Sequence, residues 1–273
     1  MPTLPLGLIV GLSEKVEDAF RAVTDVGLHA VQLACWNPNI LSREMADEVK
    51  RISQKLKISI SSVWTGYTGP CVWNFTEGPS TIGLAPPQHR AHRSAELKKG
   101  ADFAAWIGAP SITTHAGFIP EDPNDPNYKT LVPVLRDIAE HCAKNRVDFW
   151  FETGQETPVT LLRTIEDIGL KNIGINLDPA NLILYGKANP IDALDVFGKY
   201  VKGVHAKDGV YPTNGRELGH EMALGQGKVN FPVFMPKLKS LGFTGAVIIE
   251  REISGPKQVE DIKQAIKLLT PML

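Results

Sequence analysis

Short apolar runs alternate with longer amphipathic segments along the chain. An apolar run of about four to eight residues between turn residues is typical of a buried strand, and apolar positions three and four apart are typical of a helix that covers a sheet. We expect strands in eight stretches, which are "LPLGLIVGL", "AVQLACW", "ISISSVWTG", "SITTHAG", "VDFWFETGQE", "IGINLDPANL", "VKGVHAKDG" and "GAVIIERE".

The segments between these runs carry helix start and stop signals. Ser13 and Ser42 are expected to cap the first two helices, and Gly27 to end the first. Pro158 suits the first turn of the helix after the fifth strand. The expected helices cover 13–27, 42–56, about 88–107, about 128–144, a segment from about 158, 190–197, 232–241 and about 257–269.

This alternation predicts the fold class. Eight strands alternating with eight helices indicate parallel βαβ units, and eight units within 273 residues indicate a closed (β/α)8 TIM barrel, an α/β fold with one domain over 1–273. An open doubly wound sheet is the alternative, but no GxGxxG turn follows the first strand. Two long connections, about 66–87 and 209–229, interrupt the pattern, and we expect the first to be an active-site loop.

Composition narrows the function classes. The formal net charge is −1 and the basic residues are scattered, so the chain lacks the basic footprint of a nucleic-acid binder. Cys35, Cys71 and Cys142 are far apart and form no CxxC pair, which favours reduced thiols and a cytoplasmic protein. The N-terminal apolar run lacks a positive segment and a cleavage site and is too short to span a bilayer, so no membrane association is expected.

Charged side chains stand where four successive strands end. Reacting groups of such barrels sit at the carboxyl ends of the strands, and Glu152, Asp178, His205 and Glu250 occupy those places on strands five to eight. Three carboxylates close together repel one another in a partly dry site, and a divalent cation relieves that cost. The donor types suit Mg2+ or Mn2+, with Zn2+ and Co2+ as alternatives. Taken singly, each carboxylate has another explanation, as a helix cap or an ion-pair partner.

Several nearby residues are candidates for substrate binding, each with a structural alternative. His115 closes strand four and is expected to bind a substrate hydroxyl, a second metal or only a structural partner. Lys207 would neutralise an enediolate or a phosphate, or would pair with Asp208 or a rim carboxylate. Glu156 follows Glu152 and would bind hydroxyls, or would favour the N-terminus of the next helix.

Two tryptophans and one arginine complete the candidates. Trp36 and Trp64 end strands two and three, where their rings would pack on the apolar side of a sugar or merely on the rim. Arg216 lies on a glycine-rich loop, where substrate contact and plain exposure are both open.

In "FETG", "INLDPAN", "VHAKDG", "GQGKVNF" and "VIIERE" the chain resembles the xylose-isomerase-like barrels, the sugar phosphate isomerase/epimerase family. That family includes ketose 3-epimerases and hydroxypyruvate isomerase and is related to endonuclease IV. The resemblance covers nearly the whole chain. It implies one divalent metal ion (Mn, Mg, Co or Zn) on Glu152, Asp178, His205 and Glu250, with Glu152 and Glu250 also acting as an acid/base pair.

Two departures from the ketose 3-epimerases bear on the substrate. Those enzymes usually carry a histidine three residues after the strand-six aspartate, where this chain has Asn181. They also place an arginine soon after the strand-seven histidine, whereas the nearest one here is Arg216. We expect Asn181 to take part in substrate binding, and the departures leave the sugar open more than the metal.

The resemblance implies a metal-dependent isomerase or epimerase that acts on a small carbohydrate, phosphorylated or not, through an enediolate. By analogy the protein would form a homo-oligomer, a dimer or a tetramer. A lyase such as a keto-inositol dehydratase is an alternative with the same metal and base. An endonuclease IV-like nuclease needs more histidines at strand ends than this chain, with seven in all, provides. A non-catalytic sugar-binding barrel is disfavoured by the complete metal set.

Overall fold

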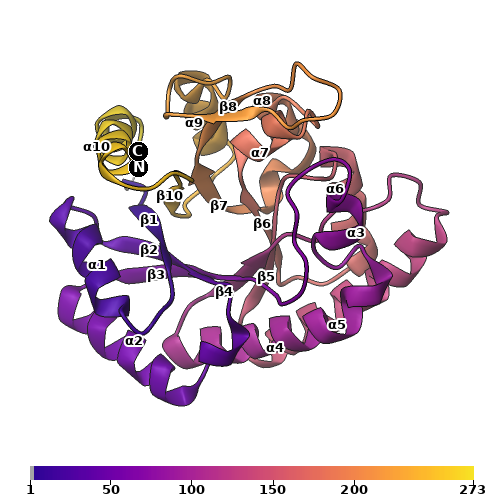
Figure 1. The fold of residues 1–273 in the computed structure, drawn as a ribbon, viewed down its shortest axis with the longest axis horizontal. Helices are drawn as coiled ribbons and strands as arrows, with labels where there is room; N and C mark the ends of the chain where they lie inside the picture. The colour runs from indigo at the N-terminus through magenta and orange to yellow at the C-terminus, as the bar shows by residue number, and fades with distance from the viewer. Residues whose placement is uncertain (1–2) are drawn as a thin grey trace.

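A computed structural model describes residues 3–273 and contains a closed barrel of parallel strands (Figure 1). The strands of the barrel are β1 (Leu6–Gly11), β2 (Ala30–Cys35), β3 (Ser59–Thr65), β4 (Ser111–Thr114), β5 (Asp148–Glu152), β6 (Ile173–Leu177), β7 (Val201–Ala206) and β10 (Val247–Ile249). Their order around the barrel is β1-β10-β7-β6-β5-β4-β3-β2. The predicted (β/α)8 fold in a single domain is therefore confirmed.

Helices connect the strands and surround the barrel (Figure 1). They are α1 (Val16–Asp25), α2 (Arg43–Leu56), α3 (Gly78–Thr81), α4 (Arg90–Ile107), α5 (Pro126–Lys144), α6 (Pro158–Ile168), α7 (Pro179–Leu184), α8 (Pro190–Phe197), α9 (Phe231–Ser240) and α10 (Pro256–Leu269). Four short 3-10 turns add to them, η1 (Pro38–Ile40), η2 (Pro87–His89), η3 (Gly198–Tyr200) and η4 (Thr270–Met272).

The two predicted serine caps have different outcomes. Ser42 accepts a hydrogen bond from the Met45 N–H at 3.2 Å and caps α2, as expected. The hydroxyl oxygen of Ser13 accepts a hydrogen bond from the Lys15 N–H and from none of the N–H groups of α1, because α1 begins at Val16 after a turn. The prediction of Ser13 as a cap is wrong, since the turn separates it from the first helical residue.

Most strand residues are buried because both faces of the strands are covered, although polar residues such as Gln32 and Ser62 lie among them. Phe149 and Phe151 pack together on one face of β5, with ring centroids 4.9 Å apart. Trp150 points to the other face, where it meets Gly174 and Gly203 on the next two strands. A side chain on either glycine would collide with its neighbours, so these glycines make room for the indole.

The long connection after β7 contains a hairpin that the sequence analysis expected as a plain loop. Its strands are β8 (Asp208–Val210) and β9 (His220–Met222), paired antiparallel. The Asp208 carboxylate accepts hydrogen bonds from the N–H groups of Gly209, Gly225, Gly227 and Val229 at 2.9 to 3.1 Å. Gly227 must lack a side chain, because a Cβ there would overlap the Asp208 carboxylate. Asp208 therefore fixes the base of this excursion.

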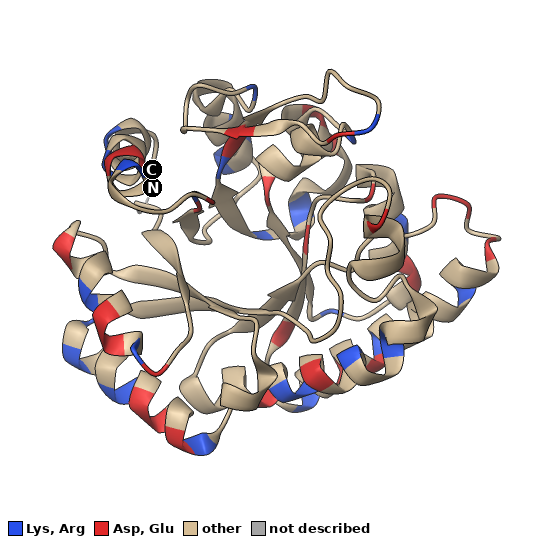
Figure 2. Ribbon diagram, in the orientation of Figure 1, with Lys and Arg blue, Asp and Glu red and all other residues tan. Residues whose placement is uncertain are grey.

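Charges of both signs are interspersed on the outer helices (Figure 2). Glu17 on α1, for example, pairs with Arg21 at 2.6 Å and with Lys55 of α2 at 2.8 Å. Over residues 3–273, none of the helices combines the length and the apolar character that crossing a bilayer requires.

Candidate metal centre and substrate pocket

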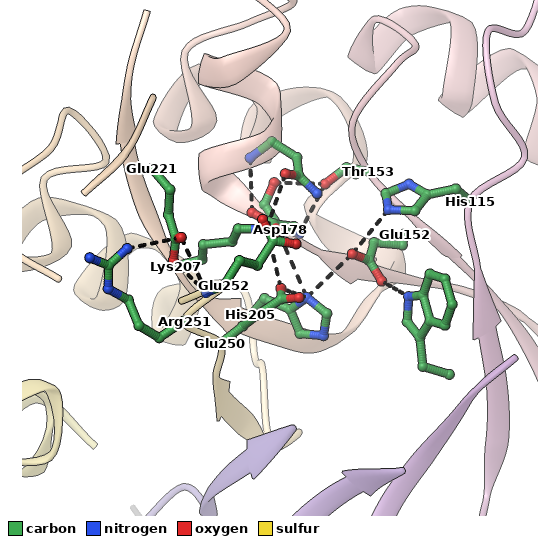
Figure 3. Close-up of polar contacts among 12 residues, drawn as sticks. His115, Glu152, Thr153, Asp178, His205, Lys207, Glu221, Glu250, Arg251 and Glu252 are labelled. Atoms are coloured by element: carbon green, nitrogen blue, oxygen red, sulfur yellow. Dashed lines mark hydrogen bonds and ion pairs between the residues drawn. The ribbon is translucent and has the colours of Figure 1, made fainter. Parts of the chain in front are cut away.

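Four donor side chains meet at the carboxyl end of the barrel (Figure 3). Glu152 ends β5, Asp178 follows β6, His205 lies near the end of β7, and Glu250 follows β10. These strands are neighbours in the barrel, so consecutive strand ends deliver their side chains to one place. One ligand atom from each residue lies within 4.8 Å of the others. The structure thus brings together the four residues named from the sequence.

Gln32 on β2 sets the tautomer of His205. The Nε2 of His205 lies 2.7 Å from Oε1 of Gln32, which accepts a hydrogen bond from the Nε2–H group. The Gln32 amide nitrogen donates in turn to Oδ1 of Asn176 at 3.4 Å, so its oxygen faces the imidazole. Nδ1 of His205 is left with a free lone pair that points into the carboxylate cluster. Gln32 was not predicted from the sequence, although it is the one amide inside the apolar run "AVQLACW" and so marks a polar contact in the barrel.

The cluster has the chemistry of a cation site. Nδ1 of His205 lies 2.9 Å from Oε2 of Glu250 and 3.7 Å from Oδ2 of Asp178. All three atoms are buried and lack a hydrogen-bond partner. Acceptors that face one another need a positive charge between them, which a proton or a cation supplies. Three carboxylates and one imidazole nitrogen suit a hard divalent ion, so the donor set fits.

The electrostatics of the cluster agree with that reading. Burial raises the pKa of the Glu152 carboxyl, but the imidazoles of His205 and His115 outweigh burial and hold this pKa well below its ordinary value. Burial lowers the pKa of His205, yet the carboxylates of Glu152 and Glu250 raise it well above its ordinary value. The cluster therefore takes up a proton when no cation is bound, and a cation would have to displace that proton.

Two side chains hold the Glu152 carboxylate in place. His115, which follows β4, has its Nε2 3.2 Å from Oε1 of Glu152. The indole N–H of Trp64 on β3 donates to Oε2 of the same carboxylate. His115 keeps its buried Nδ1 without a partner, so it retains one polar atom for a ligand.

Lys207 lies beside the donor cluster and is surrounded by carboxylates. Its Nζ is 3.1 Å from Oε1 of Glu252 and 3.6 Å from the nearest oxygens of Asp178 and Glu250. Burial lowers the pKa of the Lys207 ammonium, but these carboxylates raise it well above its ordinary value. Of the alternatives considered for Lys207, the structure shows pairing with rim carboxylates, whereas Asp208 binds backbone N–H groups instead.

A cavity of about 220 Å³ opens above the cluster and has two unlike walls. Glu152, Glu250, Glu252, Asn181 and Lys207 line one side. The side toward β2, β3 and β4 is lined by Trp36, Trp64, Trp73 and His115, and Leu184, Tyr185 and Leu218 complete the lining from the end of α7 and the β8–β9 connection.

The three tryptophans of the pocket form a connected aromatic surface. The ring centroids of Trp36 lie 4.6 Å from those of Trp64 and 6.3 Å from those of Trp73. Trp36 is 48% exposed although it is large and apolar, so its face is available to a ligand. Trp36 and Trp64 were predicted from the sequence, but Trp73 was not. Its position as an aromatic residue within the expected active-site loop could have indicated it.

The remaining candidates lie in different surroundings. Asn181 faces the pocket, and its N–H donates to Oδ1 of Asp178 at 2.9 Å. Glu156 is buried behind the pocket wall, both of its oxygens lack partners, and burial raises its pKa to about 7. Arg216 is exposed on the turn between β8 and β9 and is not part of the pocket lining.

Comparison with known proteins identifies the family. The model of the family described as "Xylose isomerase-like TIM barrel" matches residues 20–272. The chain belongs to the xylose isomerase-like TIM barrel family. The predicted resemblance is thereby confirmed at the level of the family.

The similar proteins range from related to distant. A xylose isomerase domain protein from Planctomyces limnophilus, known from its crystal structure, is 34% identical, with 99% of this chain and 97% of that chain covered and a TM-score of 0.91. The uncharacterized protein MJ1311 of Methanocaldococcus jannaschii is 29% identical over 196 residues. That match covers 65% of this chain but only 61% of the relative, which is less than two thirds of its length.

Two more distant structures share the fold. A D-tagatose 3-epimerase-like protein has a TM-score of 0.73 at 20% identity, with 98% of this chain and 97% of that chain covered. A xylose isomerase-like TIM barrel protein from Mycobacterium smegmatis, solved in complex with magnesium, has a TM-score of 0.73 at 17% identity, with both chains covered completely. At these identities the likeness concerns the fold.

Proposed function

We propose that this protein is a divalent-metal-dependent isomerase or epimerase that moves a proton on a small carbohydrate through an enediolate. The observation that carries this proposal is the convergence of Glu152, Asp178, His205 and Glu250 beside a pocket that Glu152 and Glu250 line together with three tryptophans. The family's fold and its epimerase-like and magnesium-bound structural neighbours support the proposal.

The same four residues would hold the cation. His205 would offer Nδ1 once a cation has displaced its proton, while the hydrogen bond to Gln32 keeps the other proton on Nε2. When bound, a divalent cation such as Mg2+, Mn2+, Co2+ or Zn2+ polarises a sugar carbonyl and its neighbouring hydroxyl and so stabilises an enediolate.

Glu152 and Glu250 would transfer the proton. One carboxylate removes the hydrogen of the carbon next to the carbonyl, the electron pair of that C–H bond enters the enediolate, and a carboxyl group then returns a proton to carbon. His115 and Trp64 orient Glu152 for this step, and its low pKa keeps it ionised as a base at neutral pH. Return to the opposite face gives an epimer, and return to the neighbouring carbon gives an aldose or ketose isomer.

The other pocket residues would bind the sugar. Trp36 and Trp73 offer aromatic faces to the C–H side of the ligand. Asn181 and His115 are within the lining and would contact hydroxyl groups, whereas Lys207 would hold the surrounding carboxylates in place. Glu156, in the loop that follows β5, would bind the sugar from behind the pocket lining. Arg216 would bind the sugar only if the turn between β8 and β9 moved toward the pocket.

The cellular setting proposed here is the cytoplasm, with a small-molecule substrate and a possible homo-oligomeric assembly. The support is that Cys35, Cys71 and Cys142 are all free thiols, as expected in a reducing compartment.

Solvent exchange tests the proposed reaction. The Mn2+-loaded protein is incubated with a panel of ketoses in D2O, and deuterium at each sugar carbon is measured by NMR. We expect incorporation at a carbon next to the carbonyl of one sugar, and its loss in Glu152→Gln and Glu250→Gln. Release of water with formation of an unsaturated product would instead show a lyase. Absence of exchange with every ketose, together with nicking of DNA, would show a nuclease.

A further inference from the structure

Negatively charged side chains outnumber positively charged ones around the pocket. Among residues 3–273, the lining contains the carboxylates of Glu152, Glu250 and Glu252, and Lys207 is its one lysine or arginine. Asp178 adds a further carboxylate directly behind Lys207, with Oδ2 3.6 Å from Nζ. These four carboxylates are enough to neutralise Lys207 and a bound divalent cation together.

The ammonium group of Lys207 is already surrounded by oxygen atoms. Its ammonium has three N–H donors, and it is surrounded by oxygens of Glu252 at 3.1 Å, of Asn181 at 3.5 Å and of Asp178 and Glu250 at 3.6 Å. The side chain of Lys207 is 2% exposed. An incoming anion could therefore reach Nζ only by displacing a carboxylate.

Glu252 is the member of this group at the pocket mouth. Its side chain is 58% exposed, in contrast to Asp178 and Glu250. Its backbone N–H donates to the carboxylate of Glu221 on β9 at 3.1 Å, and Glu221 pairs with Arg251 at 2.9 Å. The bond to Glu221 holds the backbone of Glu252, and the Glu252 carboxylate lies 3.1 Å from Nζ of Lys207 (Figure 3).

We propose that Glu252 is a specificity-determining residue that excludes phosphorylated sugars, so that the pocket takes neutral carbohydrates. The inference rests on the proposed function and names its substrate class. A phosphate group carries about −1.5 to −2 charges at neutral pH, and it would face Glu252 where it needs a free cation. Arg216, the one other cation considered from the sequence, is exposed outside the lining.

The opposite wall favours the same class of ligand. Trp36, Trp64 and Trp73 present apolar faces, and the indole N–H of Trp64 is already bound to Glu152. Such a surface contacts the C–H face of a sugar or cyclitol and offers no positive charge to an anion. The aromatic wall thus selects by shape and apolar contact, while Glu252 selects against charge.

Matched pairs of ligands test this inference. Binding is followed by quenching of tryptophan fluorescence, which the three pocket tryptophans report, in protein saturated with Mg2+. The pairs are D-fructose with D-fructose 6-phosphate, D-glucose with D-glucose 6-phosphate, and myo-inositol with its monophosphate. Wild type is compared with Glu252→Gln and with Glu260→Gln, which removes an equal charge from a surface pair with Lys257 on α10.

In wild type and in Glu260→Gln, we expect the neutral member of at least one pair to bind about tenfold or more tightly than its phosphate. In Glu252→Gln that ratio should fall about tenfold. Tighter binding of a phosphorylated member to wild type would overturn the inference and leave the proposed enzyme class standing. An unchanged ratio in Glu252→Gln would overturn the role of Glu252. Binding of neither member of any pair would overturn both this inference and the proposed function.

Discussion

The two halves of the barrel rim are built on opposite principles. On β5, β6, β7 and β10 the strand ends deliver carboxylates and an imidazole whose buried atoms face one another without partners. On β2, β3 and β4 the strand ends deliver Trp36, Trp64 and His115. The first half is incomplete without a positive charge, whereas the second half is packed and offers a surface. Charged donor groups and apolar surface are therefore separated across one pocket.

The difference continues one layer below the rim. Under the second half, the hydroxyl groups of Ser62 and Thr113 are hydrogen bonded to each other at 2.7 Å. Under the first half, Gln32 reaches across from β2 to His205 and leaves the Nδ1 of that imidazole free. Buried polar groups thus serve packing on one side and ligand orientation on the other.

The largest effect is expected when a donor side chain is removed from the charged half. Glu152→Gln deletes both a cation ligand and the expected base, so proton exchange should fall by about a thousandfold or more. Metal content of the purified variant and deuterium incorporation are measured together. Full metal binding with normal exchange would show that Glu152 does neither task.

The next largest effect is expected from Glu156, a buried residue of the charged half whose carboxylate oxygens have no hydrogen-bond partner. Burial raises the pKa of Glu156 from its ordinary 4.5 to about 7 in the folded protein, so the folded state prefers the protonated form. Its stabilising contribution is complete below about pH 4.5 and is lost as the pH rises through about 7. At 1.36 kcal/mol for each pKa unit, the loss amounts to about 3 kcal/mol at pH 8.

Glu156→Gln should therefore unfold at higher denaturant concentration than wild type at pH 8, and nearly the same concentration at pH 4.5. Urea titrations at both pH values check this. Glu166→Gln, an exposed change on α6, serves as the control. Equal stability of wild type and Glu156→Gln at pH 8 would contradict the assignment of a raised pKa.

Gln32 connects the two halves, and its removal should weaken the charged half alone. In Gln32→Leu the imidazole of His205 loses the acceptor that fixes its tautomer, so we expect the Kd for Mn2+ to rise about 10- to 100-fold. Calorimetric titration with Mn2+ measures the change without reference to activity. Gln32→Glu, which keeps an oxygen opposite Nε2, should restore most of the affinity, and Gln264→Leu on the surface of α10 should leave it unchanged.

The smallest effect is expected from the aromatic half. Trp36→Ala should raise the KM for the sugar about fivefold, which corresponds to about 1 kcal/mol of aromatic contact, and should leave Mn2+ affinity unchanged. Trp106→Ala is a matched control, because Trp106 packs under the guanidinium of Arg43 on the outer helices, 4.4 Å from its ring. Weaker metal binding in Trp36→Ala would show that the two halves are not separate.

Much of the fold could be predicted because apolar strands and capped helices leave local signals. The alternation fixed the barrel, and the same ordering placed Glu152, Asp178, His205 and Glu250 on adjacent strands. The stretch "IGINLDPANL" was less transparent, since its last residues belong to α7, which begins at Pro179 with Asp178 as its cap. An apolar run does not distinguish a strand from a buried helix.

The features that the sequence did not reveal depend on contacts between distant segments. Gln32 and His205 are 173 positions apart and meet only because β2 and β7 face each other across the barrel. Trp73 enters the pocket because the connection that carries it folds over the rim. The hairpin of β8 and β9 was missed because strands of three residues carry too little periodicity.

The anchoring of the β8–β9 excursion by Asp208 has an evolutionary consequence. Four N–H groups bound to one carboxylate close the base of the loop, so residues 211–218 at its tip are free to change in length and composition. Of that tip, Leu218 is the residue that lines the pocket. The tip is thus a replaceable module, through which a descendant of this chain could acquire a larger or smaller ligand while the cluster of Glu152, Asp178, His205 and Glu250 stays untouched.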